Sequence, residues 1–135
     1  MIYQFKIDPI SELILVEVLL DGIHEFNMAL DTGASHTTFD INPLYMADYP
    51  VVNKVIGTGL VETANGIVDV GILKINSLSA FGHVKHDLKV QVYDFLKHGI
   101  ISDYDGVLGL DFFKNTAFTI DMVNQTIEVK QPKEI

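Results

Sequence analysis

Short apolar runs bounded by turn residues dominate the chain, and this pattern predicts a mostly β structure. Two of these runs, residues 13–20 and 23–30, flank Asp21-Gly22, a dipeptide suited to the positive φ angles of a two-residue hairpin turn. Further strands are predicted over residues 37–39, 51–56, 67–75, 87–93, 118–122 and 126–130, of which the last two form a closing hairpin.

Two short helical segments interrupt this pattern. Asn42-Pro43, followed by an apolar stretch, predicts one helical turn with Asn42 as its N-cap. Residues 109–115, which contain Phe112 and Phe113, predict a second short helix. The chain has no internal repeat, low-complexity tract or linker, so we expect one domain over residues 1–135 with one or two short helices.

Composition narrows the possible partners. The 135-residue chain is 48% hydrophobic and 20% charged, which favours a folded domain over a disordered tail. Its net charge is −9, arginine is absent and the lysines are scattered, so we expect no nucleic-acid partner. The absence of cysteine excludes disulfides, thiolate zinc sites and cysteine nucleophiles.

The chain also lacks the usual membrane signals. No apolar run approaches the roughly 18–20 residues that span a membrane. Residues 1–6 do not have the basic-then-apolar order of a signal peptide. We therefore expect a cytoplasmic protein, or a domain of a larger one, with no membrane contact.

The most informative motif is Asp31-Thr32-Gly33-Ala34-Ser35, which directly follows the predicted strand 23–30. Two carboxylates that share one proton can hydrolyse a peptide bond, because one activates a water while the other polarises the carbonyl. Each carboxylate needs a tightly fixed loop. Thr32 can donate a hydrogen bond to an opposing loop, and Gly33 permits a close backbone approach. Ordinary Asx turns use the same residue types, so the motif alone is only suggestive.

A second element, Val107-Leu108-Gly109, lies far downstream of this motif. With it, the chain resembles the retropepsin-type aspartic peptidases, specifically their single-lobe bacterial and cellular members. The matching segments, in the family's order and spacing, are residues 29–35, 54–59, 70–75, 105–113 and 118–121. The resemblance implies a single-lobe acid-protease β-barrel in which the Asp31 loop packs against residues 107–109.

The resemblance also implies a homodimer with its site on the two-fold axis, and the motif count leads to the same expectation. A second Asp-Thr-Gly or Asp-Ser-Gly is missing, and a symmetric dimer would supply the second Asp31. Retroviral members usually carry arginine after the apolar-apolar-Gly element, whereas this chain has Leu110. A different or weaker dimer interface follows as a hypothesis.

The resemblance implies that Asp31, Thr32 and Gly33 form the catalytic loop. Substrate contacts are expected from Ala34, Ser35, His36, Gly57, Thr58, Gly59 and Val107. Retroviral members commonly have acidic residues where Ser35 and His36 stand, so the outer substrate contacts should differ. For the flap hairpin that closes over substrate, we favour residues 57–59 as the substrate-facing segment, while Asn65-Gly66 is the stronger hairpin-turn signal.

Other polar residues have plainer interpretations. His83 and His86 have a His-x-x-His spacing, but a strand points them to opposite faces, so we expect surface histidines and neither a metal nor a cofactor. Asp111 is expected to cap or pack the short helix, and Asp121 to begin the last turn. The phenylalanines are expected in the core, as Phe112, Phe113 and Phe118.

Together these observations predict a homodimeric aspartic endopeptidase, in which a water between two Asp31 carboxylates attacks an extended peptide that pairs as an added strand. Hydrophobic side chains are expected beside the cut bond. The alternative is a retropepsin-like dimerisation or peptide-binding module with little or no turnover, because a fold does not guarantee activity. A third interpretation, a metal hydrolase using His83 and His86, predicts sensitivity to chelators.

Overall fold

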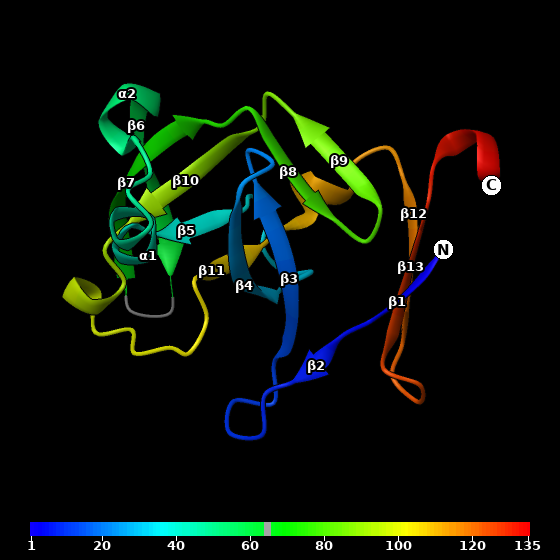
Figure 1. The fold of residues 1–135 in the computed structure, drawn as a ribbon. Helices are drawn as coiled ribbons and strands as arrows, with labels where there is room; N and C mark the ends of the chain where they lie inside the picture. Colours follow the sequence, from blue (N-terminus) through cyan, green and yellow to red (C-terminus); the bar gives the residue numbers. More distant parts are fainter. Residues whose placement is uncertain (64–65) are drawn as a thin grey trace.

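About half of the residues lie in strands in the computed structural model, which describes residues 1–63 and 66–135 (Figure 1). One sheet has ten strands: β2 (Lys6–Ile7), β3 (Ile14–Leu20), β4 (His24–Leu30), β5 (Thr38–Asp40), β6 (Val55–Thr63), β7 (Gly66–Lys74), β8 (Ser77–Ala80), β9 (His83–His86), β10 (Lys89–Tyr93) and β11 (Gly106–Leu108). A three-stranded sheet contains β1 (Ile2–Gln4), β12 (Ala117–Asp121) and β13 (Thr126–Lys130).

The helices are short. The described residues form the α-helices α1 (Ile41–Met46) and α2 (Val51–Lys54), and the 3₁₀ turns η1 (Leu96–His98), η2 (Leu110–Phe113) and η3 (Pro132–Glu134). The prediction of a mostly β fold with one or two short helices is therefore confirmed. In the part of the chain that the structure describes, no helix is long and apolar enough to cross a membrane.

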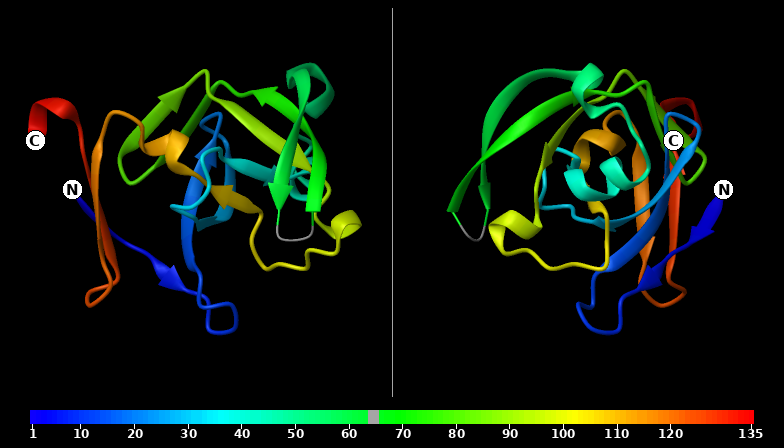
Figure 2. Two further views of the ribbon diagram at one scale, coloured as in Figure 1. Left: turned by 180° about the vertical axis from the view of Figure 1, so that it is seen from behind. Right: turned by 60° about the vertical axis from the view of Figure 1, so that its left-hand side comes forward.

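The large sheet has the strand order β6-β7-β10-β5-β11-β4-β3-β8-β9, with β2 paired to β3 beside this path. The described parts of β6 and β9 are the two edges and do not pair with each other, so the sheet is not the closed barrel that we expected. The three-stranded sheet and the β6–β7 hairpin lie at opposite ends of the molecule (Figures 1 and 2).

The β3–β4 hairpin delivers the chain to the Asp31 motif. Its turn has positive φ at Asp21 (53°) and Gly22 (73°), as the dipeptide predicted, and Ile23 N donates to Leu20 O at 3.1 Å. Alternate residues of both strands are buried: Val16, Val18, Leu20, Phe26, Met28 and Leu30. The hairpin is thereby held by the core up to the residue before Asp31.

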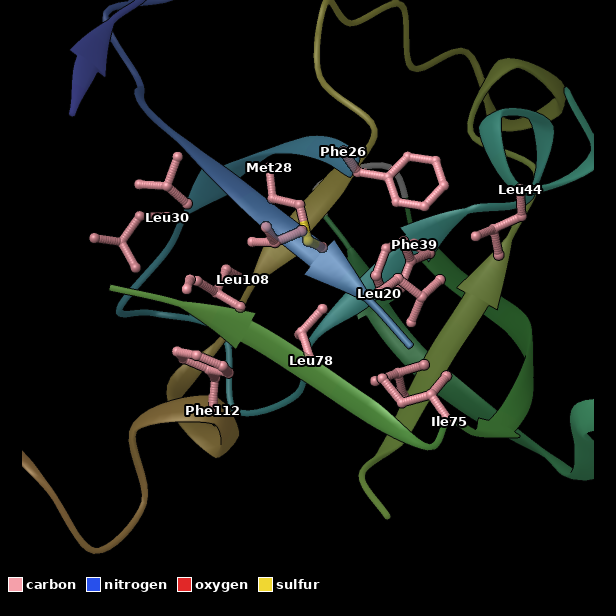
Figure 3. Packing of buried hydrophobic residues seen from close by; sticks show 14 of the residues in the cluster. Leu20, Phe26, Met28, Leu30, Phe39, Leu44, Ile75, Leu78, Leu108 and Phe112 are labelled. Atoms are coloured by element: carbon pink, nitrogen blue, oxygen red, sulfur yellow. The ribbon is translucent and has the colours of Figure 1, made fainter. Parts of the chain in front are cut away.

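The core extends beneath the downstream element as well. Leu108 and Phe112 are fully buried and lie in the same cluster as Leu20, Met28 and Leu30 (Figure 3). Full burial of one such side chain contributes about 1.5–3 kcal/mol relative to its exposure. The expectation that Phe112 and Phe113 are core residues is confirmed, and Phe118 packs against the cluster partly buried.

Two local predictions are wrong. Residues 51–54 form α2 instead of a strand, because the chain turns after Pro50 to bury Val51, and Asn53 N donates to Pro50 O at 3.1 Å. The N-cap of α1 is Asp40, not Asn42, since the Asp40 carboxylate accepts a hydrogen bond from Asn42 N at 3.3 Å. The Asn42 side chain instead donates to the Asp40 carboxylate at 3.0 Å.

Candidate active site

The position of Asp31 is set by two parallel strands. β4 and β11 pair in the register Ala29 opposite Val107 and Leu30 opposite Leu108. Asp31 N then donates to Leu108 O at 3.0 Å, which extends the pairing by one residue. The predicted packing of the Asp31 loop on residues 107–109 is therefore present.

Beyond Asp31 the chain forms a compact loop. Gly33 N donates to Asp31 Oδ1 at 2.8 Å and Ala34 N donates to Asp31 O at 3.1 Å. Ala34 O accepts from Leu110 N at 2.8 Å, so the loop is tied to the chain just after β11. Asp31, Thr32 and Gly33 are exposed, although the strand that carries them is buried. The loop thus presents a fixed carboxylate to the outside.

A buried threonine fastens the exit of this loop. Thr37 is 0% exposed; its N donates to Asp111 Oδ2 at 2.9 Å and its hydroxyl donates to Asp111 Oδ1 at 2.7 Å. The same hydroxyl accepts from Gly109 N at 3.1 Å. Asp111 also accepts from Phe112 N at 2.9 Å, which agrees with its expected role at the short helix. We call these contacts the Thr37–Asp111 clamp.

Sequence analysis did not find this clamp. Thr37 and Asp111 are 74 positions apart, and neither residue is unusual in its local sequence. Close backbone packing accompanies the clamp. A Cβ atom on Gly109 would lie 2.7 Å from His36 C and 2.9 Å from Ala34 O. Only glycine fits between the loop and η2, which explains the glycine of the Val107-Leu108-Gly109 element.

A pocket of about 360 Å³ adjoins the loop. Its lining residues are Asp31, Gly33, Ala34, Ser35, His36, Thr38, Val61, Glu62, Thr63 and Gln91. Five predicted site residues thus meet in one pocket with the end of β6. A larger cavity of about 470 Å³, bordered by Tyr3–Lys6 and Phe81 among others, shares no lining residue with it. We place the candidate site at the pocket that contains Asp31, because the carboxylate of the predicted catalytic loop lines it.

The β6–β7 hairpin reaches the pocket by its far end. Residues 57–59 lie in mid-strand opposite Ile72, Gly71 and Val70, and do not line the pocket. Pairing continues to Thr63 opposite Gly66, where Gly66 has φ of 116°. Asn65, the other predicted turn residue, lies outside the described residues. Substrate contact by Gly57, Thr58 and Gly59 stays a prediction.

The floor of the site is a row of side chains across the sheet. Val107 pairs with Ala29 on one side and Thr38 on the other, and Thr38 pairs with Gln91. Directly opposed residues share a face of a sheet, so Val107 lies on the same face as the two pocket residues Thr38 and Gln91. Gln91 alternates with the buried Val90 and Val92 along β10, but only the parallel pairing of β5 with β10 places it beside Asp31 in the pocket.

Burial and nearby charges shift the pKa values of two residues, Tyr104 and Asp105. Burial, and then the negative charge of Asp31, raise the pKa of Tyr104 above its usual value, so the phenol stays neutral near the carboxylate. Burial, and then the charge of Asp40, raise the pKa of Asp105, while the hydrogen bond that its carboxylate accepts from Asn27 N at 2.9 Å opposes this change. Ser35 Oγ lies 2.9 Å from His36 Nδ1 at the pocket wall.

His83 and His86 lie in different environments. His86 is exposed, but His83 is 7% exposed, so the expectation of a surface position is wrong for His83. Its Nε2 lies 3.0 Å from Phe112 O, and Gln131 Nε2 lies 2.7 Å from its Nδ1. Both ring nitrogens are therefore engaged inside the fold. Residues 1–63 and 66–135 contain no group of three or more His, Cys, Asp or Glu side chains that could hold a metal ion.

Comparison with known proteins agrees with this geometry. Residues 16–112, which include the Asp31 loop and β11, match the family model described as aspartyl protease. A solved structure of a retropepsin-like aspartic protease from Rickettsia conorii superimposes with a TM-score of 0.64 at 14% identity, covering 96% of this chain and 93% of that chain. At this identity the likeness supports the fold alone. No curated protein sequence matches the chain. The chain belongs to the aspartyl protease family and has a retropepsin-like fold.

Proposed function

We propose that the protein is an aspartic endopeptidase that acts as a homodimer. The observation that carries the proposal is the exposed Asp31 carboxylate, held at the end of a buried strand beside a pocket that the β6–β7 hairpin borders. The chain has one such motif, and the reaction needs two carboxylates that share a proton. A two-fold axis beside the exposed loop would bring two Asp31 side chains together.

The roles of the neighbouring residues follow from their positions. Asp31 of each copy would hold the attacking water, and Gly33 would keep the carboxylate oriented through its N–H. Thr32 is exposed on the same loop and would contact the opposing copy. An extended peptide would lie over Val107 and pair with exposed backbone as an added strand, with the end of β6 above it.

The decisive variant is Asp31→Asn. Cleavage of a peptide mixture should fall by about 10²–10⁴-fold or more, because the variant loses a general acid–base group. The amide oxygen can still accept the hydrogen bond from Gly33 N–H, so melting temperature and mass in solution should not change. Asp87→Asn removes the same charge from an exposed position between β9 and β10, away from the pocket, and serves as the control. Undiminished cleavage by Asp31→Asn would refute the mechanism.

Leu110 favours a second candidate function, a peptide-binding module with little turnover. This residue is 42% exposed directly beside the loop contact at Ala34 O, and as an aliphatic residue it offers no ion pair to a partner. A stable monomer at micromolar concentration that binds peptides without cleaving them would support the module. A dimer that cleaves them would support the peptidase.

A further inference from the structure

The pocket beside Asp31 has an unusually polar floor for a site expected to take hydrophobic side chains. Thr38 and Gln91 are half-buried there, and Thr38 Oγ1 donates to Gln91 Oε1 at 3.2 Å, with His36 O as a more distant second acceptor at 3.4 Å. Ser35 and His36 form the adjacent wall. The only aliphatic side chains larger than glycine that line the described pocket are Ala34 and Val61.

We propose that this pocket is a specificity subsite that takes an amide side chain, asparagine or glutamine, from the peptide substrate. The proposal rests on the proposed peptidase function and names its substrate class. It replaces the expectation of a hydrophobic preference for the one substrate position that enters this pocket. Thr38 and Gln91 are its specificity-determining residues.

Hydrogen-bond capacity favours an amide ligand. Because Gln91 Oε1 accepts from Thr38, the amide nitrogen of Gln91 points its two hydrogens elsewhere, and no described residue accepts them. Thr38 Oγ1 and Ser35 Oγ retain lone pairs that can accept. A substrate amide has both a donor and an acceptor and can satisfy both kinds of group. An aliphatic side chain would displace water from them and leave them unpaired, which lowers affinity.

Charge argues against an acidic side chain in the same pocket. Asp31 and Glu62 both line it, and no lysine stands among its described lining residues. A third carboxylate would be repelled by the other two. A basic side chain would meet Asp31 and Glu62, but both carboxylates are exposed, and exposed ion pairs contribute little. Its ammonium or guanidinium group would also face the Gln91 amide hydrogens, which are donors like itself.

The test first maps where the wild-type protein cuts a proteome-derived peptide mixture, and then uses matched synthetic peptides. At the position with the strongest selectivity, the peptides carry Asn, its near-isostere Leu, Glu or Lys. We expect kcat/KM for the Asn peptide to exceed that for the Leu peptide by about 10-fold or more. The double variant Thr38→Val with Gln91→Leu should remove or reverse this ratio.

Controls separate specificity from stability. Thr119→Val makes the same polar-to-apolar change on the exposed face of β12 and should leave the Asn-to-Leu ratio unchanged. Melting temperatures of all variants are recorded, and the ratio of two substrates on one preparation does not depend on the folded fraction. Selective cleavage that prefers Leu, Lys or Glu in the wild type, or an Asn preference that survives in the double variant, would overturn the subsite and leave peptidase activity standing.

A protein that cuts nothing would end the peptidase proposal but still allow the pocket to be tested. Equilibrium binding of the same fluorescent peptides is then measured with the wild-type protein. Tighter binding of the Asn peptide, lost in the double variant, would keep the pocket as an amide-binding site. Equal binding of the four peptides, or no binding, would overturn it.

Discussion

The Thr37–Asp111 clamp predicts that Thr37→Val destabilises the protein strongly although it keeps the shape of the side chain. The backbone hydrogen bond from Thr37 N to Asp111 remains in this variant. Two contacts disappear: the hydroxyl donates to Asp111 at 2.7 Å and accepts from Gly109 N at 3.1 Å. Both belong to the connection between the Asp31 loop and η2.

The expected magnitude follows from these two contacts. A hydrogen bond to a charged acceptor contributes about 1.5–3 kcal/mol, and a buried N–H left without a partner costs about 1–3 kcal/mol. Thr37 is 0% exposed and Gly109 is buried, so water cannot easily replace the hydroxyl. Since neighbouring contacts do not add fully, we expect a loss of about 2–4 kcal/mol. For a chain of this length that corresponds to a fall in Tm of about 10 °C.

Urea denaturation of Thr37→Val and Thr37→Ser measures this effect. Thr37→Ser keeps the hydroxyl and both of its hydrogen bonds and loses one buried methyl group, which should cost about 1 kcal/mol. The difference between the two variants therefore isolates the hydroxyl. If Thr37→Val proves as stable as Thr37→Ser, the clamp does not hold the loop and the reasoning is refuted.

Three further predictions concern packing and pH. Gly109→Ala should lower the free energy of unfolding by about 1–3 kcal/mol in urea titrations, because its Cβ would meet the backbone of His36 and Ala34. Burial lowers the pKa of His83 below 6.5, so as the pH falls the unfolded chain binds a proton before the folded protein does. The free energy of unfolding therefore decreases as the pH drops through 6.5. His83→Gln should lack this part of the decrease between pH 7.5 and pH 5. The pKa of Asp105 is raised in the fold, so the unfolded chain loses this proton first and the free energy of unfolding decreases as the pH rises above 3.8. Asp105→Asn should therefore be more stable than wild type at pH 7 but not at pH 3.

Local patterns predicted the elements whose stability depends on their own residues. The strands β3 and β4 alternate buried and exposed positions, and Asp21-Gly22 supplies the positive φ angles that their turn needs. The Asp31 motif and the glycine at position 109 were also recognisable, because the chemistry of the loop and a close backbone approach both restrict the residue type. Asp121 accepts from the N–H groups of residues 123 and 124, as expected of a turn residue.

Contacts between residues far apart in the sequence determine the features that local patterns did not predict. Valines at 51 and 52 favour a strand, but burial of Val51 after Pro50 yields a helical turn. His83 is polar and lies on a short strand, yet Phe112 O and Gln131 engage it from far along the chain. The partners of such residues lie far away in sequence, so a local stretch of sequence does not contain the interactions that determine their structure.

The position of Gly57 in β6 has a structural explanation. Gly57 follows an irregularity in the register of β6, between residues 55 and 57, and glycine within a strand commonly accompanies such a bulge. Thr63 lies six residues farther along, about 20 Å at the rise of a strand. The described residues of β6 that line the pocket are Val61, Glu62 and Thr63. The glycine at 57 therefore fits the irregularity of β6, independently of any contact with substrate.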